Sequence, residues 1–202
     1  MNPLDKLAEY FGEFPGIGPR QAKRFVYFLL TRNISYINGI TELINEIKNS
    51  VTICKSCFRF FQNNKENNSL CNICSSLNRD KEKLMILARD VDFETIEKSK
   101  AYNGLYFILG GTIPILDKEP EKRVRLRELI KRIDDNVKEI IISMNSTADG
   151  ENTGDYLKQY IKEKLPERNI KLTTLGRGLS TGSELEYLDS DTIKNALENR
   201  RG

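Results

Sequence analysis

The 202-residue chain contains no histidine. This absence excludes Ser-His-Asp and Cys-His catalysis, histidine general bases and histidine metal ligands. A metal ion would have to be held by cysteine, carboxylate, asparagine or backbone oxygen atoms. Cysteine itself is scarce, and the four cysteines all fall within residues 54–74.

Long hydrophobic runs are missing as well. The most apolar stretch, residues 105–116, is interrupted by Gly110, Gly111 and Pro114, whereas a membrane helix needs about 20 consecutive apolar residues. The first residues include charges and no apolar run, so we expect no secretory signal. These features predict a cytoplasmic protein with no membrane partner.

The chain has little excess charge of either sign. Lys and Arg total 32 and Asp and Glu total 29, which gives a net charge of +3, too small to indicate a polyanionic partner by itself. Apolar residues make up 39% and charged residues 30%, a balance that favours small units over one thick core. At about 150 residues per domain, the length predicts one to two domains.

Helical periodicity dominates residues 1–50. An apolar pattern of helical spacing begins the chain: Leu4, Leu7, Ala8 and Phe11. Pro19 suits the first turn of a second helix over residues 20–30, and a third apolar pattern spans residues 40–47.

From Lys83 onward, short apolar runs alternate with longer amphipathic segments. The alternation predicts a parallel sheet with helices on its faces. The expected strands span residues 84–88, 104–109, 139–144 and 170–175, and the expected helices span residues 92–101, 120–135 and 151–165.

The strongest motif is the spacing Cys54-x2-Cys57-x13-Cys71-x2-Cys74. Each Cys-x-x-Cys pair turns two thiolates toward one point, and two pairs complete a tetrahedral zinc site without an open position. We therefore predict a structural Zn²⁺ that folds a segment of about 25 residues with too little core of its own. Disulfides or a redox dithiol are the alternatives, but a cytosolic chain disfavours structural disulfides and a redox site needs only one pair.

The second motif is a glycine-containing turn before the second helix. Gly16 and Gly18 permit backbone conformations and close approaches that side chains block. On a helical wheel, Arg20, Lys23 and Arg24 share one face. The opposite face is apolar: Ala22, Phe25, Val26 and Leu29. This layout is typical of a helix-hairpin-helix that binds a sugar-phosphate backbone through amides and charge; the alternative is an ordinary turn with a solvated basic face.

A basic run covers residues 118–132, with seven Lys or Arg and three Glu. The excess positive charge could bind the phosphates of a nucleic acid. A solvated face of an amphipathic helix around Val124, Leu126 and Leu129 explains it at least as well.

Acidic residues follow two of the expected strands. Asp90 and Asp92 come after the first strand, and Asp149 and Glu151 come after the third. Ligands of open parallel sheets bind at the carboxyl ends of the strands, so these acids could hold Mg²⁺. Asp149 and Glu151 also fit a helix start, where negative charge complements the helix dipole.

The last motif is a loop over residues 176–187 that is rich in glycine and small polar residues. It lacks the Gly-Lys-Ser/Thr ending of a phosphate-binding P-loop. We expect it to position a C-terminal interaction arm.

Taken in order, these motifs resemble the RecR family of bacterial recombination mediators over essentially the whole chain. The matching segments are Pro3-Leu4-Asp5-Lys6-Leu7, Phe14-Pro15-Gly16-Ile17-Gly18-Pro19-Arg20, the four cysteines, Asn78-Arg79-Asp80, Gly104-Leu105-Tyr106, Leu109-Gly110-Gly111, Gly150-Glu151-x-Thr153, Arg177-Gly178-Leu179 and Leu185-Glu186-Tyr187.

The resemblance implies an α+β protein of several modules. They are a helix-hairpin-helix DNA-binding region (1–50), a four-cysteine zinc finger (51–80), a Toprim-like α/β parallel-sheet domain (81–176) and a C-terminal arm (177–202). It also implies a ring-shaped homotetramer that binds single- and double-stranded DNA and helps RecO and RecF to load RecA onto gapped DNA. The family's basic positions fall on Arg20 and Arg24. Its Toprim acids, which bind Mg²⁺ or a partner, fall on position 88, Asp92, Glu97, Asp149 and Glu151.

The chain departs from the family at the first of these acids. Ala88 stands where the family has Glu, Asp149 where it has Glu, and Ser180 where it has Pro. Toprim enzymes need that first Glu to handle protons or metal during phosphoryl transfer. Because the chain also lacks histidine, we predict a non-enzymatic scaffold. The alternative is a Toprim-type metal-dependent nuclease or topoisomerase-like enzyme.

Overall fold

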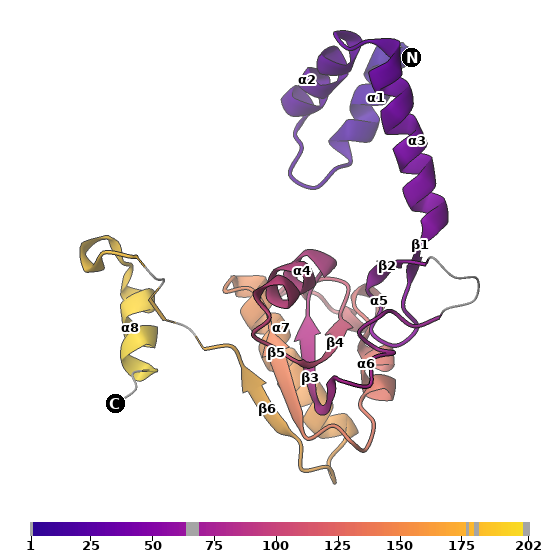
Figure 1. Ribbon diagram of the computed structural model, residues 1–202. Helices are drawn as coiled ribbons and strands as arrows, with labels where there is room; N and C mark the ends of the chain where they lie inside the picture. The colour runs from indigo at the N-terminus through magenta and orange to yellow at the C-terminus, as the bar shows by residue number, and fades with distance from the viewer. Residues whose placement is uncertain (1, 64–68, 177, 180–181, 200–202) are drawn as a thin grey trace. The chain divides into compact units, whose positions relative to one another are not determined.

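The computed structural model describes residues 2–63, 69–176, 178–179 and 182–199 (Figure 1). Arg177 and Ser180 of the sequence motifs lie outside these residues. The chain divides into two units, Met1–Thr52 and Ile53–Gly202. In the described part of the chain, no helix combines the length and the apolar character that crossing a membrane requires.

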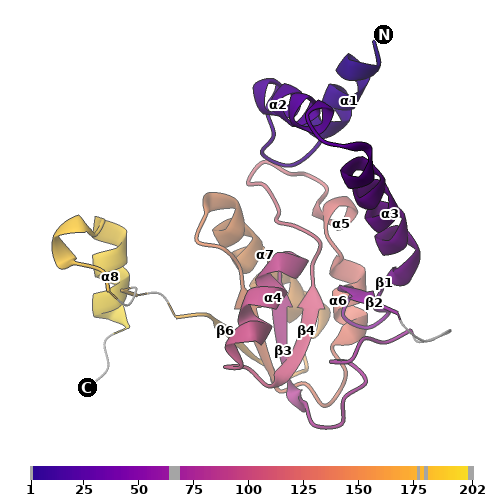
Figure 2. The same cartoon turned by 45° about the horizontal axis from the view of Figure 1, so that its top comes forward.

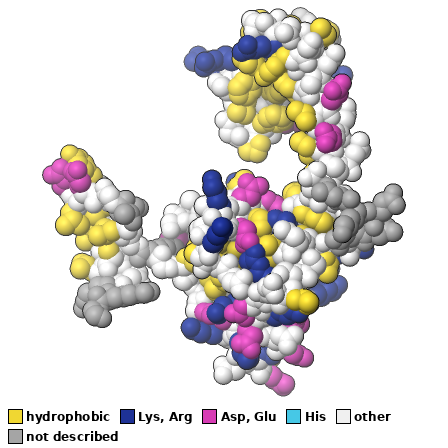
Figure 3. Space-filling view, viewed as in Figure 1, with side chains coloured by type: hydrophobic (Ala, Val, Ile, Leu, Met, Phe, Trp, Pro, Cys, Tyr) yellow, Lys and Arg dark blue, Asp and Glu magenta, His cyan; other side chains and the backbone are white. Residues whose placement is uncertain are grey.

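The first unit is built from α1 (Pro3–Gly12), α2 (Pro19–Leu30) and α3 (Ile34–Ser50). The ring of Phe11 in α1 contacts Phe25 of α2 edge-on, with the ring centroids 5.8 Å apart. The buried residues of the unit are small: Ala8, Ala22 and Val26. α3 has no buried residue among its seventeen, and Figure 3 shows hydrophobic side chains on the surface of this unit.

A parallel sheet forms the centre of the second unit, as predicted. Its described strands are β3 (Asp80–Leu87), β4 (Gly104–Ile108), β5 (Glu139–Ser143) and β6 (Lys171–Thr174), in the order β4-β3-β5-β6. In the register, Met85 of β3 is paired with Tyr106 of β4 and with Ile141 of β5. Since all strands run the same way, their carboxyl ends lie at one edge of the sheet.

The two faces of the sheet have different covers (Figures 1 and 2). Leu84 and Phe107 face a core completed by α6 (Leu126–Arg132) and α7 (Ala148–Lys164). On the other face, Met85 and Tyr106 pack with α4 (Asp90–Ser99). Alternation of side chains along each strand sorts these residues between the two cores.

The cysteine segment completes the cover of the α4 face. It contains a small sheet of β1 (Val51–Ile53) and β2 (Phe60–Gln62). Cys54, Cys57 and Cys71 belong to the same hydrophobic cluster as Met85 and Tyr106. The segment therefore shares a core with the sheet, which supplies the apolar contacts that its own short sequence lacks.

The prediction of one helix over residues 120–135 is wrong. The structure has α5 (Pro120–Arg123) and α6, separated by extended backbone at Val124. The amide of Arg125 donates to the carbonyl of Leu109 at 3.0 Å, and its guanidinium donates to the carbonyl of Ile108 at 3.0 Å. These bonds to the end of β4 replace helical bonds, so tertiary contacts override the local helical preference.

The helix predicted from Glu151 begins earlier, at Ala148, because Thr147 accepts a hydrogen bond from the amide of Gly150 at 3.2 Å and caps α7. After β6, the described arm contains a short 3-10 helix (Leu185–Tyr187) and α8 (Ser190–Glu198).

Candidate metal centre and nucleic-acid interface

The four cysteines converge on one point. The Sγ atoms all lie within 4.8 Å of one another, and those of Cys57 and Cys71 are 3.6 Å apart. Zn–S bonds of about 2.3 Å place the sulfurs of a tetrahedral site about 3.8 Å apart, whereas a disulfide bond is about 2.05 Å long. All four cysteines are free of disulfides. Of the described residues, these are the ones that lie close enough together to hold a metal ion with three or more side chains.

The surroundings of the cysteines suit a metal-bound thiolate cluster. Cys54, Cys57 and Cys71 are buried, and the amide of Cys71 donates to the Sγ atom of Cys54 at 3.3 Å. A hydrogen bond with Cys57 lowers the pKa of Cys54, and the same contact raises the pKa of Cys57. Four sulfurs this close cannot all ionise without a cation among them, and a metal ion would supply that charge.

Two contacts fasten the cysteine segment to α4. The guanidinium of Arg59 lies over the ring of Phe93, 4.4 Å from its centroid. The amide of Phe60 donates to Oδ1 of Asp90 at 2.8 Å. Asp90, an acid that the sequence placed after the first strand, therefore serves as an acceptor for the cysteine segment.

The basic residues of α2 lie on its exposed face. Arg20, Lys23 and Arg24 are exposed, while Ala22 and Val26 are buried, so the predicted division of the helix into two faces is confirmed. No ion pair joins the three cations to an acid within the described residues, in contrast to many cations of the second unit.

The backbone conformation of the turn before α2 explains why one position of the motif is a glycine. Gly16 has a φ of +78°, in the left-handed region that favours glycine. Gly18 has a φ of −85° and forms the N-cap of α2, where no side chain caps the helix. By contrast, Asn2 accepts from the amide of Leu4 in α1, and Asn33 accepts from the amide of Tyr36 in α3.

The candidate acids lie at the carboxyl edge of the sheet, in the first turns of two helices. Asp92 accepts a hydrogen bond from the amide of Arg89 at 3.0 Å and so caps α4. Asp149 and Glu151 lie in the first turn of α7. Ala88, directly after β3, is 2% exposed, so a buried methyl group stands where the resemblance leads us to expect a glutamate.

Glu97, the remaining acid, forms an ion pair with Arg79, whose side chain is 13% exposed. The hydroxyl of Tyr106 donates to Glu97 at 2.8 Å. Burial opposes ionisation, but the bonds from Arg79 and Tyr106 outweigh it and lower the pKa of Glu97. Sequence reasoning missed this network, although Arg79 stands in the Asn78-Arg79-Asp80 motif.

Two hydrogen bonds hold the loop after β4 against α7. The amide of Ile113 donates to Oγ1 of Thr153 at 2.8 Å, and the carbonyl of Ile113 accepts from Asn152 at 2.9 Å. Thr153 is fully buried. This contact gives the Gly150-Glu151-x-Thr153 motif a structural role that its spacing alone did not reveal.

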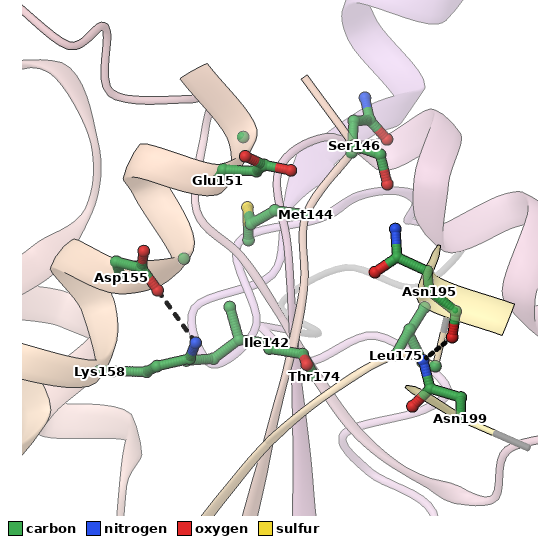
Figure 4. A pocket seen from close by; sticks show the side chains of 14 residues that line it. Ile142, Met144, Ser146, Glu151, Asp155, Lys158, Thr174, Leu175, Asn195 and Asn199 are labelled. Atoms are coloured by element: carbon green, nitrogen blue, oxygen red, sulfur yellow. Dashed lines mark hydrogen bonds and ion pairs between the residues drawn. The ribbon is translucent and has the colours of Figure 1, made fainter. Parts of the chain in front are cut away.

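A pocket lies along the carboxyl ends of β5 and β6 and the start of α7 (Figure 4). Glu151, Asp155 and Lys158 line it from α7. Asp155 and Lys158 form an ion pair at 3.0 Å. Of the predicted acids Asp92, Asp149 and Glu151, only Glu151 is among the lining residues.

Comparison with protein families agrees with this architecture. The model of the Toprim domain matches residues 82–176, and the model described as "RecR, C-terminal" matches residues 178–201.

Curated relatives named recombination protein RecR match nearly the full chain. The protein of Phytoplasma mali is 35% identical over 198 residues, which cover 98% of this chain and 93% of the relative. The proteins of Rippkaea orientalis and Streptococcus thermophilus are each 34% identical, over 98% of this chain and 96% of each relative. The chain belongs to the RecR family of recombination proteins.

Proposed function

We propose that this protein is a cytoplasmic DNA-binding scaffold of recombinational repair that catalyses no reaction. The observation that carries the proposal is the start of α2, where an uncapped helix end stands beside three exposed cations. Its amide groups and the helix dipole favour an anion, and Arg20, Lys23 and Arg24 add charge. Such contacts hold a sugar-phosphate backbone without reading its sequence, as a scaffold at DNA gaps requires.

We further propose that the four cysteines hold Zn²⁺. Four sulfur donors at tetrahedral spacing match the preference of this ion. With all four positions taken by protein, the metal has no site for substrate, so its role is structural. Its place in the core of the α4 face supports a role in folding.

Three features support the absence of catalysis. The chain has no histidine, and the buried Ala88 offers no carboxylate where Toprim enzymes require one. Glu97 is also occupied by Arg79 and Tyr106. The candidate residues for binding Mg²⁺ or a partner protein are Asp92, Asp149 and Glu151.

The family suggests the partners. We propose that the chain assembles as a ring-shaped homotetramer and works with RecO and RecF to load RecA onto gapped or single-stranded DNA. Exposed apolar residues near both ends of the chain support self-association: Leu43, Ile44 and Ile47 in α3, and Leu185, Tyr187 and Leu197 in the arm. Several hairpins in one ring would combine weak phosphate contacts into useful affinity.

The double variant Arg20→Ala/Arg24→Ala tests the DNA-binding face. We expect weaker binding of a labelled single-stranded oligonucleotide in fluorescence anisotropy. The slope of log Kd against log salt should fall by about 0.7 for each phosphate that the variant no longer neutralises. The fold should persist, because both side chains are exposed.

Lys6→Ala/Lys48→Ala is the matched control, since it removes the same charge from exposed positions of the same unit. Light scattering should give the same four-chain mass for both variants. Unchanged DNA affinity in Arg20→Ala/Arg24→Ala would refute the assignment of this face.

A further inference from the structure

The basic run at residues 118–132 divides into a paired part and a weakly paired C-terminal end. The paired cations are Lys122 with Glu119, Arg123 with Asp117, and Arg127 with Glu121. The guanidinium of Arg125 donates a hydrogen bond to the carbonyl of Ile108. Of the other three cations, Lys118 precedes α5, and Lys131 and Arg132 lie at the C-terminal end of α6.

This end of α6 meets the first cysteine turn (Cys54–Cys57) at a cavity of about 440 Å³. The two elements are far apart in the sequence, and both belong to the second unit. The charged and polar side chains that line the cavity are Lys55, Ser56, Glu128, Lys131, Arg132 and Asp134. Three cations therefore face two carboxylates.

The cations of the cavity are poorly neutralised. Lys55 and Lys131 are exposed, and neither forms an ion pair within the described residues. The side chain of Arg132 is 11% exposed, and its ion-pair partner, Asp134, lies 3.9 Å away. The Nε atom of Arg132 is buried without a hydrogen-bond partner in the described structure. Asp134 therefore offsets the charge of Arg132 only weakly.

We propose that this cavity binds a backbone phosphodiester of nucleic acid, as a second contact besides the face of α2; the inference rests on the proposed DNA binding. One net positive charge balances the single negative charge of a phosphodiester, whereas a free phosphate dianion would leave a net negative charge in the cavity. Lysines at the rim act as mobile point charges, and Ser56 adds a hydroxyl donor. The contact would be independent of base sequence.

The test uses the full chain with Lys55→Ala/Lys131→Ala, compared with Lys98→Ala/Lys162→Ala as a control of equal charge on exposed lysines away from the cavity. Anisotropy with a labelled single-stranded oligonucleotide is measured across a salt series. We expect the slope of log Kd against log salt to fall in the first variant, by about 0.7 for each phosphate released from the cavity. The control should keep a slope closer to that of the unmodified chain.

Equal slopes in the two variants would overturn the proposal, and if Arg20→Ala/Arg24→Ala still weakened binding, the proposed function would stand without it. An NMR titration with inorganic phosphate alone distinguishes the other source of the ligand. Saturable shifts of the Ser56 and Lys131 amides, together with an unchanged DNA slope, would also overturn the proposal by identifying a free-phosphate site.

Discussion

The two units of this chain use their apolar residues in opposite ways. In the helices of Met1–Thr52, the buried residues are Ala8, Ala22 and Val26, and large residues such as Ile44 remain exposed. The sheet unit buries its strands on both faces. The first unit therefore leaves apolar and basic side chains on its surface, while the second gains stability from its own packing.

The cysteine cluster sharpens this contrast. It lies in the core of one sheet face rather than beside the sheet. A metal ion there would stabilise the contacts of β3, β4 and α4 along with the cysteine turns. The basic face of α2 has no comparable link to a core, so substitutions there should change binding and leave the fold intact.

The largest effect should come from Cys71→Ser, which removes one of four metal ligands. Structural zinc contributes on the order of 10 kcal/mol to the folding of small zinc domains, so much of the α4 face should lose its stability. Hydrogen exchange should speed up at Met85 and Tyr106, with little change in α1 and α2. A Cys71→Ser protein that stays folded and protected without zinc would contradict the structural role.

A pair of glycine substitutions compares the packing of the two units. A Cβ atom on Gly150 would lie 2.1 Å from the carbonyl oxygen of Asn145, so Gly150→Ala should cost about 3 kcal/mol through overpacking. Gly39 in α3 has no neighbour within 4 Å of its Cβ position. Gly39→Ala should stabilise its helix by about 0.5–1 kcal/mol. Urea denaturation measures the free energy of unfolding of both variants. Changes of the same sign and size would contradict the contrast in packing between the two units.

Among the destabilising variants, Glu97→Gln should have the smallest effect, at about 2 kcal/mol near neutral pH from the loss of charged hydrogen bonds. The folded state lowers the pKa of Glu97 from its ordinary 4.5. Its contribution is therefore present above pH 4.5 and is lost as the pH falls below that value. Thermal unfolding between pH 3 and pH 7, in steps of about one unit, should show a flatter acid limb for the variant. Identical limbs would refute the role of this ion pair.

Much of the architecture could be predicted from local spacing. The four cysteines, the two-faced α2 and the alternating strands follow from short-range patterns in the chain. The break at Val124 could not, because hydrogen bonds from Arg125 to the end of β4 depend on a strand distant in sequence. The engagement of Glu97 by Arg79 and Tyr106 was missed for the same reason.

By itself, the sequence determined which residues could share a helix face, which could share a metal, and where strands and helices alternate, because each depends on a fixed spacing along the backbone. Only the tertiary structure decided what those residues touch. It placed the cysteine cluster in the core of the sheet, gave Asp90 and Glu97 hydrogen bonds within the fold, and brought Lys55 to the C-terminal end of α6. Such contacts depend on how distant segments pack, which no local spacing specifies.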